Sequence, residues 1–109
     1  MWKERSYSMI KNKEKFYGLL GLAMRAGKIV SGEELSVQEI KNNRAKCVIL
    51  AGDASEGTKK KIQNKCCFYQ VPVIIGDHRV ILGNAIGKDE RVVIAVCDSG
   101  FTKKLMTYI

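Results

Sequence analysis

The chain has 109 residues, 46% of them hydrophobic and 28% charged, which is typical of one globular domain with its own core. Nineteen Lys and Arg against eleven Asp and Glu give a formal net charge of +8, which indicates a polyanionic partner or, alternatively, a solubilising surface. No apolar run approaches the ~20 residues of a membrane span, and residues 1–15 lack the apolar core of a signal peptide. We therefore expect a single cytoplasmic domain over residues 1–109, with residues 1–12 loosely ordered.

Helical and strand-like segments alternate from the first third of the chain onward, which is the pattern of a sheet covered by helices. Apolar residues at helical spacing predict a first helix over residues 15–27, which Gly27 ends. A short strand is expected at residues 28–30. A second helix is expected over residues 33–43, with Asn42 close to its end.

The middle of the chain continues this alternation. Residues 45–52 form a continuous apolar run, typical of a central strand covered on both faces. The next helix is expected over residues 56–67, and Asp53 and Ser55 are the candidates for its N-terminal cap. A strand over residues 71–75 follows.

The last third predicts a helix, a strand and a helix. A short helix is expected within residues 76–87, with Asp77 as its N-terminal cap and Gly87 as its stop. Residues 91–97 predict the last buried strand. An amphipathic helix within residues 98–109 closes the domain.

The four cysteines do not indicate a metal centre. Thiols in a cytosolic protein stay reduced, and Cys47 and Cys97 fall in apolar runs, where a free thiol behaves as a small hydrophobic side chain. Zinc sites need paired Cys or His ligands at short spacing, which the adjacent Cys66 and Cys67 and the single His78 do not provide. We expect neither a metal nor another cofactor.

Catalytic chemistry is poorly supported by the residue patterns. The sequence offers no nucleophile with its base, no spaced carboxylate pair and no phosphate-binding G-x-x-x-x-G-K loop. His78, beside Arg79 in an expected surface turn, suits a contact residue better than a general base. Asp53, just beyond the central strand, suits a helix cap better than a catalytic acid. We therefore expect a protein that is not an enzyme.

The junction of Ser31, Gly32 and Glu33 carries more information. The first turn of a helix presents unpaired N–H groups and the positive end of the helix dipole, and glycine lets a phosphate or sugar approach the backbone. Glu33 and Glu34 complement that dipole by roughly 0.3–1 kcal/mol. A carboxylate also accepts hydrogen bonds from base amino groups, which an arginine cannot do. The sequence leaves both roles open.

Basic residues gather around this junction and along the third expected helix. Arg25 and Lys28 are favoured as contacts because they are close in sequence to Gly32. A run such as Lys59 to Lys61 is explained equally well as a solvated face. The other members of the basic set are Lys41, Arg44, Lys46 and Lys65.

Four strings occur in order along the chain: GLAMRAGKIVSGEE, AKCVILAGDAS, VPVI and LGNAIGKDERVVIAV. In these motifs the chain resembles the bacterial YlxQ family. That family is part of the superfamily of ribosomal and small-ribonucleoprotein proteins that bind kink-turns in RNA, with archaeal and eukaryotic large-subunit and box C/D relatives. The resemblance runs from about Lys15 to Leu105. It implies an α/β fold, namely a three-layer α/β/α sandwich around a four-stranded mixed sheet.

The resemblance also implies an RNA-binding face built from three places. These are the glycine-led start of the second helix, the end of the following strand, and the loop ahead of the LGxAxG motif. Leu35 and Val80 are apolar residues suited to packing on a flipped base, or to ordinary partial burial. With the basic residues, the candidate RNA contacts are Arg25, Lys28, Gly32, Glu33, Glu34, Leu35, Gln38, Lys41, Asp53, Ala54, His78, Arg79 and Val80.

The chain departs from the superfamily consensus x-Asn-Glu-x-x-Lys that follows the glycine. Glu34, Leu35 and Gln38 occupy the three specified places, so the second has no acceptor for a guanine and the third has no charge for a phosphate. Two functions therefore stay open. The first is a monomeric, non-catalytic protein that binds kink-turn or similarly bent internal-loop RNA, alongside ribosome or ribonucleoprotein components. The second is a protein-interaction adaptor on the same scaffold.

Overall fold

A computed structural model describes residues 6–7 and 9–109 of the protein. The strands of the protein form one mixed sheet. Its order is β1-β4-β3-β5-β2. β4 runs parallel to β3 and to β1, whereas β5 runs antiparallel to both β3 and β2. The four expected strands are present, and a two-residue strand extends the sheet at one edge: β1 (Ser6–Tyr7), β2 (Ile29–Ser31), β3 (Cys47–Leu50), β4 (Val73–Ile75) and β5 (Val93–Val96).

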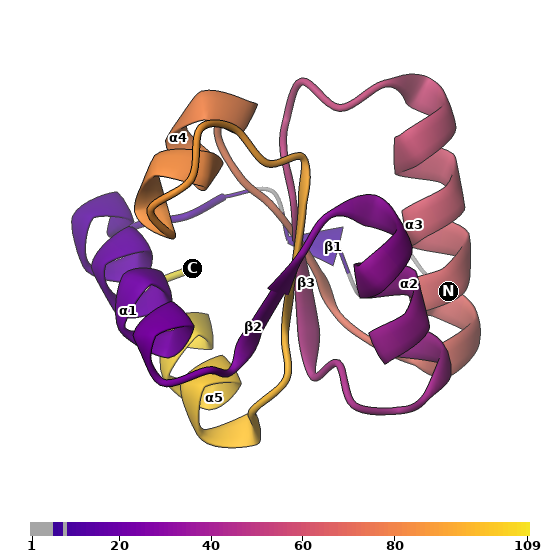
Figure 1. Cartoon of the computed structure of the whole chain (residues 1–109), viewed down its shortest axis with the longest axis horizontal. Helices are drawn as coiled ribbons and strands as arrows, with labels where there is room; N and C mark the ends of the chain where they lie inside the picture. Colours follow the sequence, from indigo (N-terminus) through magenta and orange to yellow (C-terminus); the bar gives the residue numbers. More distant parts are fainter. Residues whose placement is uncertain (1–5, 8) are drawn as a thin grey trace.

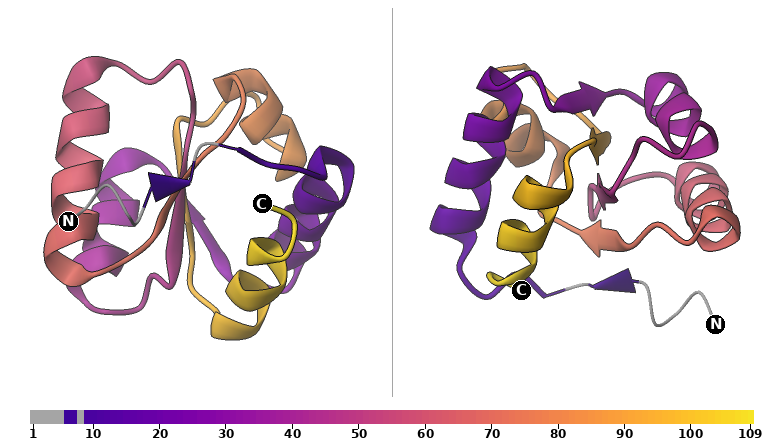
Figure 2. Two further views of the ribbon diagram at one scale, coloured as in Figure 1. Left: turned by 180° about the vertical axis from the view of Figure 1, so that it is seen from behind. Right: turned by 90° about the horizontal axis from the view of Figure 1, so that it is seen from below.

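Helices cover both faces of this sheet (Figures 1 and 2). α1, α4 and α5 lie on one face, and α2 and α3 lie on the other. This arrangement confirms the expected three-layer α/β/α sandwich. The helices are α1 (Lys13–Arg25), α2 (Glu33–Lys41), α3 (Glu56–Tyr69), α4 (Arg79–Ala85) and α5 (Ser99–Met106).

The core forms because alternate residues of the central strands face opposite layers. Along β3, Cys47 and Ile49 pack toward α1, α4 and α5, whereas Val48 and Leu50 pack toward α2 and α3. All four side chains are fully buried, as the continuous apolar run predicts. Burial raises the pKa of the Cys47 thiol to about 12, in keeping with a thiol that acts as a small hydrophobic side chain.

Two of the expected helix caps are wrong. Ser55 alone caps α3, with its Oγ accepting from the Thr58 amide at 3.2 Å, and Asp53 does not cap this helix. His78 caps α4 through its Nδ1, which accepts from the Val80 amide at 3.3 Å. Asp53 and Asp77 bind side chains of other elements instead, because those elements bring donors close to their carboxylates.

The N-terminal region is partly described. Residues 1–5 and 8 lie outside the described residues, so the expected loose order of residues 1–12 is untested there. Residues 6–7 form β1, and Lys11 and Asn12 donate backbone hydrogen bonds to the Tyr108 carbonyl at 2.8 and 3.1 Å. Asn12 also caps α1, which therefore begins at Lys13, two residues before the expected start. None of the described helices is long and apolar enough to cross a membrane.

One end of the sheet collects the loops that matter below. Ser31 at the end of β2 pairs with Ile94, and Leu50 at the end of β3 pairs with Val93 and with Ile75. We call this the loop end, which lies at the top of Figure 1. Its connections are residues 32, 51–55, 76–78 and 86–92. The opposite end carries residues 26–28, 42–46, 70–72 and 97–98.

Candidate functional site

Gly32 starts α2 at the loop end with an open backbone. Its φ of +99° is rarely adopted by other residues, and its amide donates to the Val93 carbonyl at 2.9 Å. The amides of residues 33–35 have no intrahelical acceptor, as in any first helical turn, and glycine has no side chain that could cap them. Glu34 and Leu35 are exposed, the latter at 58%. The first turn of α2 is therefore open to solvent.

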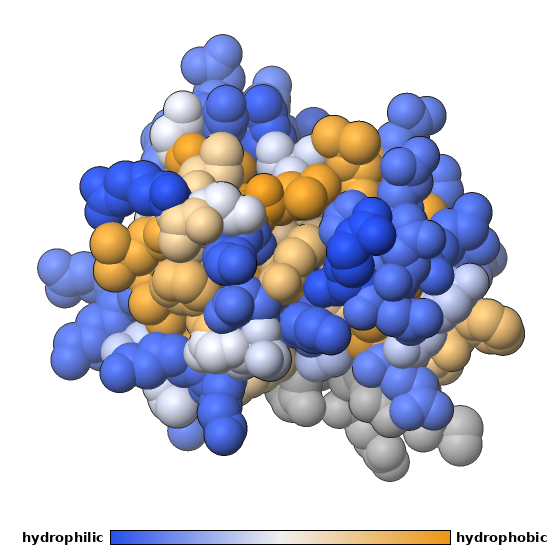
Figure 3. Space-filling model, turned by 60° about the horizontal axis from the view of Figure 1, so that its bottom comes forward, coloured by the Kyte–Doolittle hydropathy of each residue, from blue (hydrophilic) through white to orange (hydrophobic). Residues whose placement is uncertain are grey.

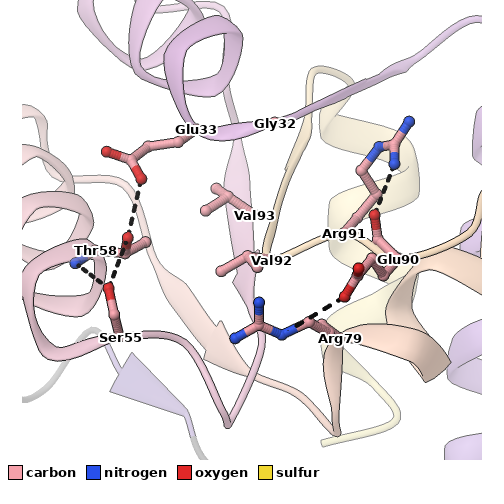
Figure 4. A pocket seen from close by; sticks show the side chains of 9 residues that line it. All are labelled: Gly32, Glu33, Ser55, Thr58, Arg79, Glu90, Arg91, Val92 and Val93. Carbon is pink, nitrogen blue, oxygen red and sulfur yellow. Dashed lines mark hydrogen bonds and ion pairs between the residues drawn. The ribbon is translucent and has the colours of Figure 1, made fainter.

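Glu33 ties this first turn to α3 (Figure 4). Its carboxylate accepts from the Thr58 hydroxyl at 3.0 Å and lies 3.1 Å from the Lys61 ammonium group. The contact with Lys61 lowers the pKa of Glu33 most, and the hydrogen bond from Thr58 lowers it further. Glu34 has no hydrogen-bond or ion-pair partner among the described residues. The two adjacent acids thus differ: one links two helices, and the other remains available to a ligand.

Asp53 joins the loop after β3 to the start of α4. Its two carboxylate oxygens accept from the Arg79 amide at 3.0 Å and from Arg79 Nε at 2.8 Å. Arg79 Nη2 also donates to the Asp53 backbone carbonyl at 3.0 Å. His78 Nε2 lies 3.1 Å from the Asp53 carboxylate. Arg79 holds the pKa of Asp53 below its ordinary value. Arg79 is therefore first of all a brace between loops.

The loops at residues 51–55 and 76–78 also touch through their backbones. The Gly52 amide donates to the Asp77 carbonyl at 3.0 Å, and a Cβ at Gly52 would lie 2.9 Å from the Gly76 carbonyl oxygen. Tyr17 of α1 supports the second loop, because its hydroxyl donates to Asp77 Oδ2 at 2.9 Å and accepts from the Asp77 amide at 3.0 Å. Desolvation by burial raises the pKa of Tyr17, which keeps the hydroxyl protonated and able to donate.

The LGxAxG motif brings a fourth segment to the site. A Cβ at Gly83 would lie 2.5 Å from Glu90 Cα, so only glycine lets the segment after α4 pack this closely. The Lys88 amide donates to the Gly83 carbonyl at 2.8 Å, and the Arg91 amide donates to the Arg79 carbonyl at 3.0 Å. The motif thus seats residues 88–92 at the loop end.

Sequence reasoning missed this fourth segment. Arg91 Nε donates to the Ser31 hydroxyl at 3.1 Å, and its Nη1 donates to the Glu90 carbonyl. The only available signal was that Glu90 and Arg91 precede a buried strand, and its antiparallel direction had to be known to place them here. With the α2 start, they enclose a pocket of about 320 Å³ (Figure 4). Its lining is Gly32, Glu33, Ser55, Thr58, Arg79, Glu90, Arg91, Val92 and Val93.

The charges around this pocket are mostly paired. Lys61 pairs with Glu33, and Arg79 pairs with Asp53 and lies 3.9 Å from Glu90. Arg91 differs, because no carboxylate of the described residues lies within 4.0 Å of its guanidinium. It is therefore the pocket's cation that is best placed to meet an anion.

The structure gathers only part of the predicted contact set. Gly32, Glu33, Glu34, Leu35, Asp53, His78, Arg79 and Val80 come from the three predicted segments of the loop end. Gln38 lies one turn further along α2 on the side of Glu34. Ala54 is only 6% exposed and packs in the core, so its side chain is not on the face.

The remaining three basic candidates lie elsewhere. Lys28 precedes β2 and Lys41 ends α2, which places both at the opposite end of the sheet from Gly32. Arg25 lines a separate hollow between α1 and α4. Closeness in sequence did not become closeness in space, because β2 and α2 carry the chain from one end of the sheet to the other and back.

Comparisons with known proteins agree with this architecture. A three-layer α/β/α sandwich with loops gathered at one end of a mixed sheet defines a class of small α/β domains. Residues 14–106 match the ribosomal protein L7Ae/L30e/S12e/Gadd45 family, and the chain belongs to this family. The resemblance found in the four ordered strings is confirmed.

Individual relatives are similar over most of their length. The chain is 50% identical over 95 residues to a protein of Bacillus subtilis (strain 168) named RNA-binding protein YlxQ, covering 87% of this chain and 95% of that one. It is 46% identical over 93 residues to a protein of the same name from Enterococcus faecium, covering 85% and 89%.

Solved structures share the fold. A Bacillus halodurans C protein described as having unknown function matches with a TM-score of 0.84 and 49% identity, covering 86% of this chain and 95% of that chain. A Giardia lamblia 15.5kD RNA binding protein matches with a TM-score of 0.75, covering 94% of each chain. At 15% identity, this second likeness concerns the fold alone.

Proposed function

We propose that the protein binds RNA at the loop end and recognises a kink-turn or a similarly bent internal loop. The observation that carries this proposal is the open first turn of α2, which lies beside two braced loops and the Arg91 guanidinium. The net charge of +8 supports a polyanionic ligand. The relatives from Bacillus subtilis and Enterococcus faecium, both named RNA-binding proteins, support the same conclusion.

Each part of the site suits a feature of bent RNA. An internal loop exposes base edges and brings phosphates close together, so shape can be recognised with few base contacts. The free amides of residues 33–35 and the Arg91 guanidinium suit phosphates. The Glu34 carboxylate suits the amino and imino groups of a guanine. Leu35 and Val80, at 58% and 43% exposure, suit apolar contact with a flipped base.

Binding rather than catalysis is the proposed activity. His78 Nδ1 accepts a hydrogen bond from the Val80 amide, and its Nε2 faces the Asp53 carboxylate. Both ring nitrogens are therefore engaged in holding the loop, which argues against a general base. We propose that the protein acts as a monomer among ribosome or ribonucleoprotein components in the cytoplasm.

A double variant tests the proposed face. Glu34→Gln replaces the charged base acceptor by a neutral amide, and Arg91→Gln removes one phosphate contact; neither side chain is buried. We expect affinity for a kink-turn duplex to fall roughly 10- to 100-fold in a gel-shift titration. A fully paired duplex of equal length should bind native protein more weakly than the kink-turn.

Lys28→Gln with Lys41→Gln is the control for position in the molecule. It removes two positive charges at the opposite end of the sheet, and its affinity for the kink-turn should stay close to native. Equal affinities of the native protein and the Glu34→Gln, Arg91→Gln variant would refute the proposed face. Circular dichroism of each variant checks that the fold is retained.

A protein-interaction adaptor is the second candidate function. It is favoured by Leu35, which is 58% exposed in the first turn of α2, and by the uncharged Gln38 beside it. In this case the native protein would bind kink-turn and paired duplexes equally weakly. A Leu35→Ser variant would then lose a protein partner rather than an RNA.

A further inference from the structure

One face of α3 carries a set of residues that the loop-end site does not use. Lys61, Asn64, Lys65 and Phe68 follow one another at spacings of three, one and three, which places them on one side of the helix. We call these four residues the α3 stripe. With Tyr69 they line a hollow of about 400 Å³.

Phe68 is the most unusual member of the stripe. Its side chain is 78% exposed, the highest value among the large hydrophobic residues of the described chain. The ring packs edge-on against Tyr69, with centroids 4.9 Å apart and planes at 76°. Tyr69 in turn packs against the buried cluster beneath α3. The Phe68 ring is therefore held in place at the surface.

The surroundings of Phe68 are basic and polar. α3 carries four lysines and a single acid, Glu56, in its first turn. Lys65 has no carboxylate within 4.0 Å among the described residues. Figure 3 shows mainly hydrophilic residues over the side of the molecule formed by α2 and α3. A held aromatic ring beside cations suits a nucleic-acid strand better than the apolar face of a peptide.

The stripe begins where the loop-end pocket ends. Thr58 lines that pocket, and Lys61 pairs with Glu33 at the start of α2. From Thr58 to Phe68 the helix axis advances about 15 Å. A strand that leaves the loop end along α3 therefore meets Lys61, then Lys65 and then the aromatic ring.

We propose that the α3 stripe is a second RNA-binding surface, which holds a single-stranded segment adjoining the bent helix. Lys65, which is free of an ion pair among the described residues, contacts its phosphates, and Lys61 is shared between Glu33 and the strand. An unpaired base stacks on Phe68. This inference rests on RNA binding at the loop end, because the bent helix is what delivers the strand to α3.

The test compares a kink-turn duplex with the same duplex carrying a single-stranded extension at each of its ends in turn. For the native protein, at least one extension should raise the affinity about five- to tenfold, the lower range for stacking of one base on an aromatic ring. Phe68→Leu should abolish this gain and leave the affinity for the unextended duplex unchanged. Phe68→Trp should retain the gain, since it keeps an aromatic face.

Lysine variants test the phosphate contacts. Lys65→Gln should lower the slope of log affinity against log salt by about 0.7 for the extended duplex only. Lys59→Gln is the matched control, because a residue two positions before Lys61 projects about 200° away around the helix. Among the described residues it pairs only with the exposed Glu56, at 4.0 Å, and its loss should leave the slope unchanged.

The outcomes separate the two proposals. If the unextended kink-turn binds but no extension adds affinity, or if Phe68→Leu keeps the gain, the α3 stripe is not an RNA surface and only this inference fails. The same holds if Phe68→Leu loses a protein partner while its RNA affinity is native. If the unextended kink-turn does not bind at all, the proposed function itself fails.

Discussion

The two ends of the sheet are built in different ways. At the loop end, side-chain contacts join residues far apart in the chain: Asp53 and Arg79 are 26 residues apart, and Ser31 and Arg91 are 60 apart. At the opposite end, the bidentate ion pair of Arg44 with Glu39 joins residues only five apart. Cys97 Sγ also donates to Glu39 Oε1 at 3.6 Å across 58 residues, so the opposite end has a long-range contact too. Among the described residues, however, long-range ion pairs occur at the loop end, where loop positions are specified by the whole fold.

Basic side chains without an ion pair are more numerous at the opposite end than at the loop end. At the opposite end, Lys28, Lys41 and Lys46 are exposed and form no ion pair among the described residues. At the loop end, Arg79 and Lys61 are paired, whereas Arg91 and the exposed Lys88 form no ion pair among the described residues. Charge density alone would therefore point to the opposite end, whereas the proposed site follows the arrangement of donors.

The largest effect should come from breaking the close packing at the loop end. Gly83→Ala places a Cβ 2.5 Å from the Glu90 backbone, which has to move. We expect a loss of about 1–3 kcal/mol in the free energy of unfolding, measured with urea, together with loss of RNA affinity. Gly18→Ala in α1 is the matched control, because nothing lies within 4 Å of its new Cβ. That variant should gain roughly 0.5–1 kcal/mol, and an equal loss in both variants would contradict the packing argument.

Removal of the brace between loops should have the next largest effect. Asp53→Asn weakens the hold on Arg79, so the loops at residues 51–55 and 76–78 lose their fixed positions. RNA affinity should fall about tenfold, the equivalent of one hydrogen bond to a charged group. Glu39→Gln breaks the comparable pair at the opposite end and should leave the affinity native. Native affinity in both variants would show that the brace does not shape the site.

A smaller effect should separate the free cations of the two ends. Arg91→Gln should reduce the slope of log affinity against log salt by about 1, because one phosphate contact is lost. Lys28→Gln removes the same charge at the opposite end and should keep the native slope. The measurement is a titration of fluorescent kink-turn RNA at several salt concentrations. Slopes that change equally in the two variants would mean that only net charge matters.

The smallest effect should come from lowering the pH, which acts on the Asp53–Arg79 pair. Arg79 holds the pKa of Asp53 below its ordinary value of 3.8, so the pair contributes stability that is complete above this value and is lost as the pH falls through the lowered pKa. RNA affinity should therefore show no pH dependence from titration of Asp53 between about pH 5 and 8. NMR titration of the Arg79 amide should follow Asp53 below pH 3.8 only. A midpoint above that value would show that the pair is absent.

The fold was largely predictable because its signals are local. Gly27 and Gly87, both with φ of +75°, directly follow the C-cap residues of α1 and α4, as expected of helix stops. The uniform burial of β3 matches its continuous apolar run. β1 escaped prediction, because two residues carry no periodicity. Asp53 and Asp77 were misassigned as caps, since their partners lie 26 and 60 residues away in the chain.

The site was predictable only in part, for the same reason. Gly32 could be predicted because a glycine directly ahead of a helix is a local signal in the sequence. Arg91 does not, because its place beside Ser31 depends on β5 running antiparallel to β2. Lys28 was a natural choice next to Gly32 in sequence, and only the direction of β2 separates them.

The position of β5 in the sheet determines when, during synthesis, the loop end can form. β5 lies between β3 and β2, yet it follows every other described strand in the chain. Before residues 93–96 have been synthesised, β2 has no strand partner among the described residues, and Gly32 lacks the Val93 carbonyl that holds it. Under the proposed function, a growing chain therefore cannot complete its RNA site until β5 has been made.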